Sequence, residues 1–296
     1  MRTVHRLSGL LVLSSCLALG SATARLHAGE GPPARPAFSE VTIRSGADLR
    51  ALRKKLGSEG ILLLEKVNRR DRTHMRAKTR LAVPAPPLDF DVYSPFPVEL
   101  ERLNGIPKAV LVSLRVQAFG AYEKGRLVRW GPVSTGGSKH QTPAGLYHTN
   151  WRSRRRVSTL NSHWIMPWYF NLHTSMGVAF HEYAIPGRPQ SFGCIRLLKE
   201  DARWIYSWAD VWIPPIEPGT PPRAFGTPVI VFAAYDYASP APWRNLANDP
   251  ASADVDRAAL ERALEKYLSV VRQRTTERLS LEQVLESESR PAGQGN

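Results

Sequence analysis

Cysteine is scarce in this sequence, with only Cys16 and Cys194 among 296 residues. Two cysteines cannot form a multi-disulfide framework, so the chain is not a disulfide-stabilised scaffold. After residue 24 no apolar run approaches the 18 or more residues that a membrane-spanning helix needs, and we expect no transmembrane segment. Acidic residues are also few, 26 against 40 Lys and Arg, which gives a formal charge of +14.

The N-terminus has the pattern of a secretory signal peptide. Arg2 and Arg6 form a basic start, residues 7–19 form an apolar run, and Ala22-Thr23-Ala24 is a cleavage site of the A-x-A type. We therefore expect residues 1–24 to be removed and the mature protein to be exported. Leu13-Ser14-Ser15-Cys16 also resembles a lipoprotein box, and a lipid anchor on Cys16 is the alternative. Simple cleavage is preferred because apolar residues continue beyond Cys16.

Cleavage after Ala24 leaves Cys194 as the single cysteine. Its thiol is then buried and inert, paired between chains, or reactive. Cleavage also removes Arg2 and Arg6, so the formal charge falls from +14 to +12. An exported basic protein suits an anionic partner such as peptidoglycan or a membrane surface, whereas general solubility explains the charge equally well. Export makes a nucleic acid partner improbable, and none is expected.

Composition divides the rest of the chain. The 24 prolines and 21 glycines, with short apolar segments between them, indicate a β-rich fold rather than a helical bundle. Residues 25–44 have the composition of a linker, and residues 45–96 are predicted to form a small helical region. The strand-like segments span residues 97–233. Helical spacing of apolar residues predicts a C-terminal helical extension over residues 234–286, and residues 287–296 are predicted to be disordered.

The helical region offers two interpretations. Ser45 is placed to cap a helix, and a second helical segment ends at Asn68-Arg69 before the short run Leu81-Ala82-Val83-Pro84. That arrangement resembles the back half of a LysM-type wall-binding repeat, although the front half is missing. The alternative, a plain helical prodomain, requires no such repeat and is preferred.

The chemistry is concentrated in residues 178–197. Val178-Ala179-Phe180-His181 is predicted to be a strand that ends in a histidine, and a loop with two prolines leads from it to Ser191-Phe192-Gly193-Cys194. We expect a helix to begin at Leu197, which would place Cys194 near the helix N-terminus and lower the pKa of its thiol. A histidine one loop away is suited to take the thiol proton, and the N–H groups of Gly193 and Cys194 to receive an oxyanion.

Ser191-Phe192-Gly193-Cys194-Ile195-Arg196-Leu197, with a histidine upstream, closely resembles the L,D-transpeptidase (YkuD-like) catalytic domain family. The opening strands are similar too, from Tyr122 to Gly136 and from Thr142 to Tyr147. The resemblance implies a mostly-β sandwich or barrel domain over residues 97–233, with helical N- and C-terminal extensions and an α+β fold overall. It implies no cofactor.

The resemblance also implies roles for residues. Cys194 would be the nucleophile and His181 the general base, while Gly193 and Ser191 would form the oxyanion site or order the loop. Arg196 and Phe192 occupy motif positions expected to contact the substrate. Phe192 departs from the family pattern, because a second histidine is usual there and a phenyl ring cannot donate a hydrogen bond.

The implied activity is that of a periplasmic L,D-transpeptidase involved in cell-wall organisation and cell shape. It would cut a bond between an L-centre and D-alanine in a peptidoglycan stem peptide, form a thioacyl-enzyme at Cys194, and pass the acyl group to an amine. The acceptor would be another stem peptide or a wall-anchored protein. Two alternatives remain open, namely a carboxypeptidase or wall-protein-releasing hydrolase that uses the same thiol, and a non-catalytic wall-binding protein.

Several other residues have a structural and a functional interpretation. The spacing of His163, His173 and His181 fits no usual zinc-ligand pair, so we expect no metal. The basic run from Trp151 to Arg156 is either a solvated loop or a contact for stem-peptide carboxylates. Packing is the default for Trp164, Trp168 and Tyr169, with the substrate groove as the alternative.

Overall fold

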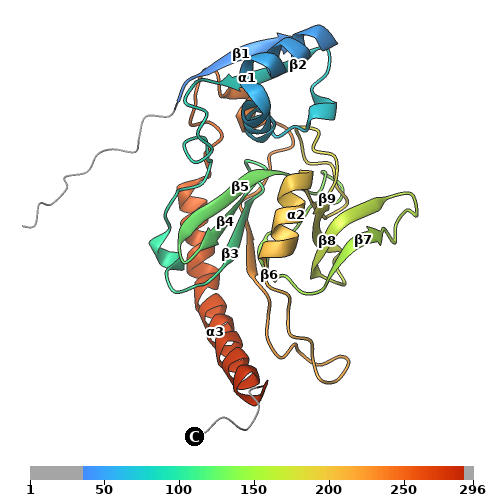
Figure 1. Ribbon diagram of the computed structural model, residues 1–296, viewed down its shortest axis with the longest axis vertical. Coiled ribbons are helices and arrows are strands. Elements are labelled where there is room, and N and C mark those ends of the chain that lie inside the picture. Colours follow the sequence, from blue (N-terminus) through green and yellow to red (C-terminus); the bar gives the residue numbers. More distant parts are fainter. Residues whose placement is uncertain (1–35, 290–296) are drawn as a thin grey trace, which may run out of the picture. The chain divides into compact units, whose positions relative to one another are not determined.

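The computed structural model describes residues 36–289, and its central feature is one curled nine-stranded sheet (Figure 1). The predicted signal peptide and Cys16 lie outside the described residues. Along the sheet the strand order is β6-β11-β3-β4-β5-β10-β9-β8-β7. The strands are β3 (Ala109–Ser113), β4 (Ala118–Glu123), β5 (Arg126–Ser134), β6 (Gly145–His148), β7 (Arg152–Val157), β8 (Ile165–His173), β9 (Val178–Glu182), β10 (Ile195–Leu197) and β11 (Pro228–Phe232).

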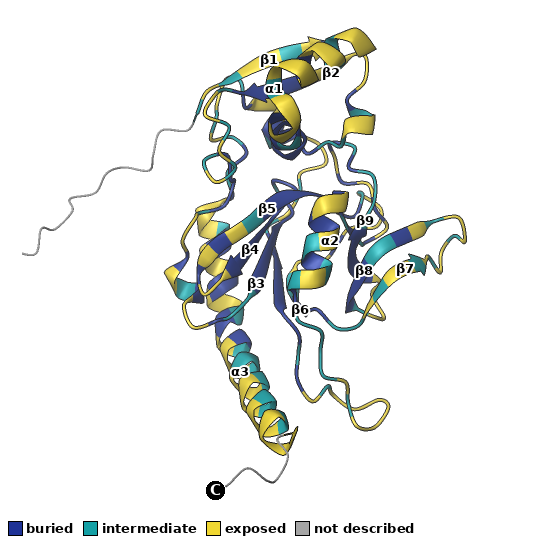
Figure 2. Ribbon diagram, viewed as in Figure 1, coloured by how far each residue is buried: buried dark blue, intermediate teal, exposed yellow. Residues whose placement is uncertain are grey.

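The middle strands are apolar on both faces because both faces are covered. In β3, Val110 and Val112 pack in one core cluster with Phe119 of β4 and with the helix α2 (Lys199–Trp208). Leu111 points to the opposite face, where it packs in a second cluster with residues of the C-terminal helix. Figure 2 shows these strands as the buried centre of the molecule. The continuous run of apolar residues in β3 is therefore explained by the two cores on either side of it.

The described part of the N-terminal region contains two strands, and the sequence did not indicate the first of them. Strand β1 (Phe38–Ile43) lies within the expected linker and pairs antiparallel with β2 (Thr79–Pro84). Helix α1 (Gly46–Val67) lies between them and is kinked at Gly57, where φ is +70°. The region is thus a β1–α1–β2 unit rather than a purely helical segment, with a front strand before the helix. A wall-binding role for it stays a prediction.

The C-terminal helix α3 (Arg257–Ser289) packs its first half on the sheet through Leu260, Leu264, Leu268 and Val271. Its second half projects from the sheet (Figure 1). Arg278 fastens this half by donating hydrogen bonds to the carbonyls of Val211 and Phe225, at 2.9 and 3.0 Å.

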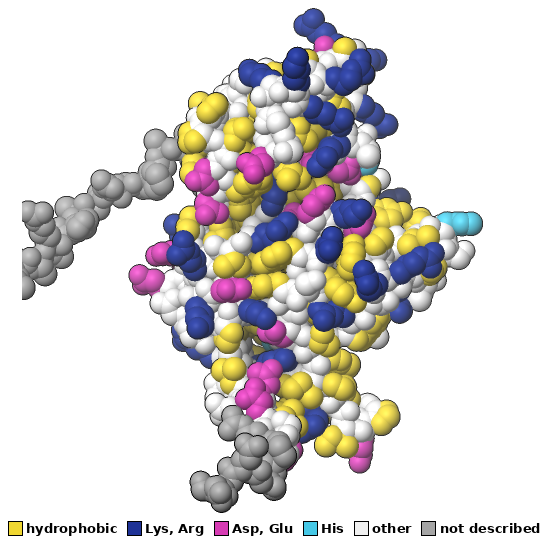
Figure 3. All heavy atoms as spheres, viewed as in Figure 1, with side chains coloured by type: hydrophobic (Ala, Val, Ile, Leu, Met, Phe, Trp, Pro, Cys, Tyr) yellow, Lys and Arg dark blue, Asp and Glu magenta, His cyan; other side chains and the backbone are white. Residues whose placement is uncertain are grey.

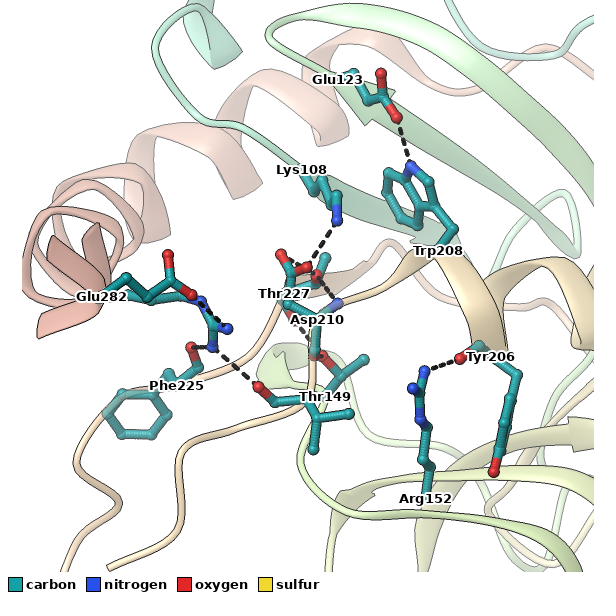
Figure 4. Close-up of polar contacts among 12 residues, drawn as sticks. Lys108, Glu123, Thr149, Arg152, Tyr206, Trp208, Asp210, Phe225, Thr227 and Glu282 are labelled. Carbon is teal, nitrogen blue, oxygen red and sulfur yellow. Dashed lines mark hydrogen bonds and ion pairs between the residues drawn. The ribbon is translucent and has the colours of Figure 1, made fainter. Parts of the chain in front are cut away.

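A polar network lies next to that anchor, where the chain leaves α2 (Figure 4). Lys108 forms an ion pair with Asp210 at 2.7 Å, and the Asp210 N–H donates to the Thr227 hydroxyl at 2.9 Å. The Thr149 hydroxyl donates to the Asp210 carbonyl at 2.6 Å. These contacts join the loops at this end of the sheet to one another and so support the surface on which α3 lies.

The predicted mostly-β domain with N- and C-terminal extensions is confirmed as an α+β fold, and the N-terminal extension contains strands as well as a helix. Short strand segments with turn residues predicted the sheet correctly because local alternation and local turns are read directly from sequence. Within residues 36–289, no helix has a stretch long and apolar enough to cross a bilayer.

Candidate active site

His181 lies on β9, in the interior of the sheet between β10 and β8. Alternation along β9 puts Val178 and Phe180 into the core shared with α2, and it turns Ala179 and His181 to the other face. The ring is almost completely buried. Its Nδ1 lies 2.9 Å from the carbonyl oxygen of Glu182, which can only accept, so Nδ1 carries the proton and donates. Nε2 is therefore the acceptor nitrogen.

Cys194 directly precedes the short strand β10, so the expectation that it lies near the N-terminus of a helix beginning at Leu197 is wrong. Helix α2 begins only at Lys199, because residues 195–197 pair with β9 on one side and β5 on the other. The thiol therefore lies beside strand backbone, with no helix N-terminus to stabilise its anion. Its Sγ donates to the carbonyl of Gly177 at 3.2 Å, and the Ala179 N–H points toward it.

The turn before the cysteine is held by side chains of its own and of a neighbouring loop. The Ser191 hydroxyl donates to the Cys194 carbonyl at 2.5 Å and accepts the Gly193 N–H at 3.2 Å. Thr142 donates to the Gly193 carbonyl at 2.8 Å. Gly193 has φ +105°, a conformation that favours glycine. Because Ser191 already binds the Gly193 N–H, that donor is occupied in this state of the turn.

Strand register brings the histidine and the cysteine to the same face. Strands β9 and β10 are parallel, with Arg196 opposite His181 and Ile195 opposite Phe180. Cys194 thus lies two residues before Arg196, the residue opposite His181. Strand geometry then places the Cα atoms of Cys194 and His181 roughly 8 Å apart. Both side chains line one cavity of about 500 Å³. Ser191, Phe192 and Arg196 line it as well.

Burial keeps both groups neutral. The pKa of His181 is lowered to about 4, chiefly by desolvation, with the Glu182 hydrogen bond opposing this and the charge of Arg196 acting in the same direction as desolvation. Desolvation also raises the pKa of the Cys194 thiol to about 11, opposed by the Ala179 N–H and the charge of Arg196. The expected depression of the thiol pKa is therefore wrong for this state, since it rested on a helix N-terminus that is absent. The site holds a neutral thiol and a neutral imidazole near pH 7.

The walls of the cavity are aromatic and cationic. Arg156 lies over the rings of Trp151 and Tyr169, at 4.6 and 5.3 Å from their centroids. Arg196 lies 4.6 Å from the ring centroid of Tyr183. The basic run from residue 151 is thus not a solvated loop, because residues 152–157 form β7 and Arg156 faces the cavity. Two guanidinium groups beside a thiol are suited to a substrate that carries carboxylates.

Phe192 lies at the rim and is 48% exposed. Its ring stacks on His140, with centroids 4.5 Å apart, and contacts Trp164 at 5.1 Å. Trp164 and Tyr169 line the cavity, whereas Trp168 packs with Tyr206 of α2. The expectation that Trp164 packs in the core is therefore wrong, because Trp164 lines the cavity.

Two residues that contribute to this site were not predicted from the sequence. Tyr183 faces His181 edge-on, with centroids 5.8 Å apart, and the alternation that places His181 on this face could have revealed it. Asp71 of the N-terminal unit accepts the Ile185 N–H at 2.6 Å, and its own N–H donates to the Ile185 carbonyl. That contact holds the loop between His181 and Cys194, and no local pattern could have indicated it because it joins segments 114 residues apart.

Neither His163 nor His173 lines this cavity. Among residues 36–289, no three or more His, Cys, Asp or Glu side chains are grouped so as to hold a metal ion.

Comparison with protein families gives a match over residues 107–231, to the YkuD model described as the L,D-transpeptidase catalytic domain. The matched segment begins just before β3, ends within β11, and includes His181 and Cys194. A search of curated protein sequences found no significant match.

Solved structures give distant matches. An L,D-transpeptidase from Stackebrandtia nassauensis is 23% identical, with 44% of this chain and 57% of that chain covered and a TM-score of 0.36. L,D-transpeptidase 1 from Mycobacterium tuberculosis is 23% identical, with 42% and 62% covered and a TM-score of 0.32. An L,D-transpeptidase from Xylanimonas cellulosilytica is 21% identical, with 68% and 100% covered and a TM-score of 0.40. The chain thus spans less than two thirds of the first two structures.

Proposed function

We propose that this chain, whose residues 107–231 belong to the YkuD L,D-transpeptidase catalytic domain family, is a periplasmic acyltransferase acting on peptidoglycan stem peptides. Cys194 is its nucleophile and His181 its general base. The observation that carries the proposal is the tautomer of His181. Because Nδ1 donates to the Glu182 carbonyl, Nε2 is left as a proton acceptor in the same cavity as the thiol.

The reaction begins when the thiol turns from the Gly177 carbonyl toward His181. Nε2 then takes the Sγ proton as Sγ attacks the carbonyl carbon of the bond between the L-centre and D-alanine. The Cys194 N–H is the donor suited to the oxyanion, since the Gly193 N–H is bound by Ser191. Collapse of the intermediate breaks the C–N bond, and the imidazolium returns its proton to the departing amine of D-alanine. A thioester on Cys194 remains.

An acceptor amine completes the transfer. It attacks the thioester carbon, gives a proton to His181, and forms an amide as the thiol is released with a proton from the imidazolium. Arg156 and Arg196 are placed to bind substrate carboxylates, because both line the cavity and are held by aromatic rings. If water attacks instead, the product is a shortened peptide, and the protein is a carboxypeptidase or hydrolase.

Mass spectrometry of purified muropeptides incubated with the protein distinguishes these outcomes. We expect free D-alanine and cross-linked dimers with wild-type protein, and neither with Cys194→Ala, which trims one small side chain and should keep the fold. Shortened monomers without dimers would identify a hydrolase. If wild-type protein gives no product and its mass is unchanged after incubation with a carbapenem, the chain is a non-catalytic binder and the proposal is wrong.

A further inference from the structure

Four arginines from three separate segments converge on one hollow outside the active-site cavity. Arg70 follows α1, Arg76 precedes β2, Arg188 lies in the loop between His181 and Cys194, and Arg244 lies in the short 3-10 helix Pro242–Asn245. The hollow has a volume of about 270 Å³, and these four side chains line it. We call them the arginine cluster.

The cluster lacks acidic partners. In the described part of the chain none of the four guanidinium groups forms an ion pair. Asp71, which follows Arg70 in the chain, is already occupied by hydrogen bonds from Thr73 and from the Ile185 N–H and by the His74 ring. Arg70 uses one guanidinium nitrogen on the His74 carbonyl, at 3.1 Å. Four like charges are thus held together without a direct ion pair to a described acidic residue, and the charge of Asp71 acts on Arg70 only from a longer distance.

The positive charges of the cluster repel one another. The pKa of Arg70 is lowered, chiefly by burial and next by the charge of Arg244, with Arg188 and Arg76 acting in the same direction. Asp71 opposes these effects. Bringing guanidinium groups together in a half-buried hollow is unfavourable unless an anion binds among them. The arrangement therefore indicates a ligand with more than one negative charge.

We propose that the arginine cluster binds a phosphate-bearing anion. Arginine forms paired, charge-assisted hydrogen bonds with phosphate oxygens, and a phosphate or diphosphate group offers oxygens in the several directions from which these four side chains approach. A second hollow, of about 460 Å³, shares Arg70 and Arg244 and is also lined by Lys78, by Arg80 and by Glu40, which forms an ion pair with Arg80. A recessed site of this shape suits a soluble or polymer-borne phosphate better than a flat lipid surface.

Binding here would also brace the catalytic loop. Arg188 belongs to the segment that joins His181 to Cys194, and its carbonyl accepts the Ser134 hydroxyl at 2.8 Å. Gly187 is so close to Arg70 that an added Cβ would meet the Arg70 guanidinium at 2.7 Å. An anion held by Arg70 and Arg188 would therefore connect the N-terminal unit to this loop. Amide hydrogen exchange in residues 185–190 should slow when the ligand is bound.

Isothermal titration with sodium pyrophosphate, at constant ionic strength, tests the site. We expect one saturable site in the full-length mature protein and at least tenfold weaker binding in the double variant Arg76→Gln/Arg244→Gln. The matched control is Arg50→Gln/Arg53→Gln on the exposed side of α1, which makes the same change in net charge and should leave affinity unchanged. The control is needed because Lys and Arg side chains are spread over the whole visible face (Figure 3).

Equal weakening in both double variants would show a general charge effect and overturn the proposal, as would equal affinity in all three proteins or no binding by wild type. Circular dichroism and thermal melting without anion check that the variants fold. If the cluster variant does not, Arg188→Gln, on an exposed loop side chain, takes its place with the same expected loss. Binding to phosphatidylglycerol vesicles without binding to pyrophosphate would identify a lipid surface and reject the soluble ligand.

Discussion

At the scale of single residues, the state of Cys194 and His181 follows from where each lies. The sequence led to the proposal that they act as nucleophile and base, but it did not reveal their protonation. The imidazole is buried on a strand and donates to the Glu182 carbonyl, and the thiol is partly buried beside Gly177. Water is excluded from the imidazole and reaches the thiol only in part, so both groups are neutral. Under the proposed mechanism the proton moves during attack and not before it.

This arrangement predicts the pH dependence of acylation. The pKa of His181 is lowered to about 4 and that of Cys194 is raised to about 11, so the neutral pair persists between these values. We expect the second-order rate constant for acylation by a carbapenem to be flat from about pH 6 to 9. On the acid side it should fall as His181 takes up a proton. Stopped-flow measurement over pH 4.5–9.5 checks this, and a limb centred near pH 6.5 would contradict it.

Phe192 is the one motif position that departs from the family pattern. Its ring is largely exposed and stacks on His140 and Trp164 at the rim of the cavity. We expect Phe192→His to preserve or raise acylation and to change the free energy of unfolding by less than about 1 kcal/mol, since an exposed side chain is replaced. Carbapenem kinetics and urea unfolding measure the two effects. A large fall in acylation would show that the phenyl ring itself binds substrate.

At the scale of elements, buried charged residues connect the end of α1 to the domain that contains the nine-stranded sheet. Lys66 lies 3.5 Å from Asp201 of α2 and also donates to the Trp130 carbonyl. Asp201 is 1% exposed and binds Arg129 at 2.7 Å. No local pattern around Lys66 distinguishes it from the exposed lysines earlier on the same helix.

Removing the Lys66 ammonium should destabilise the fold strongly, because Asp201 would lose one of its two cationic partners inside the protein. We expect Lys66→Ala to lower the free energy of unfolding by about 3 kcal/mol. Lys54→Ala, on the exposed part of the same helix, should change it by less than about 0.5 kcal/mol. Urea unfolding of both variants gives the comparison. Equal, small effects would mean that water reaches Asp201.

Elements also show where sequence patterns fail. The strands of residues 109–134 were predicted because each alternates or runs apolar over its own length. Strand β10 was predicted as turn and helix, since its three residues carry no pattern and are extended only because β5 and β9 pair with them. Strand β1 was also missed because it is extended only through pairing, here with β2, which lies some 40 residues further along the chain.

At the scale of the whole molecule, two buried histidines link stability to pH. Burial lowers the pKa of His148 to about 3, with the charge of Arg274 acting in the same direction, as burial lowers that of His181 to about 4. Each histidine is neutral in the folded protein and titrates near 6.5 when unfolded. The unfolded state therefore gains protons first as pH falls, and stability present above pH 6.5 is lost progressively toward pH 4.

We expect the free energy of unfolding of wild-type protein to fall by a few kcal/mol between pH 7 and 4.5, partly through these two groups. His148→Gln should make that fall smaller by about 2 kcal/mol, because one of the two groups no longer titrates. His163→Gln, on an exposed side chain, should leave it unchanged. Urea unfolding at both pH values measures the difference. A steep fall that persists undiminished in His148→Gln would assign it to other groups.

The sequence by itself determined the β-rich domain and its helices at both ends, and it indicated His181, Ser191, Gly193 and Cys194 as candidate site residues. These features are local, since a strand, a turn and a motif are each written in consecutive residues. Tertiary structure alone decided which groups meet. The register of β9 on β10 puts the imidazole and thiol on one face, burial sets their pKa values, and Asp71 with the arginine cluster reaches the catalytic loop from a distant segment. Distance in space and access of water depend on how the whole chain packs, and neither is encoded at any single position.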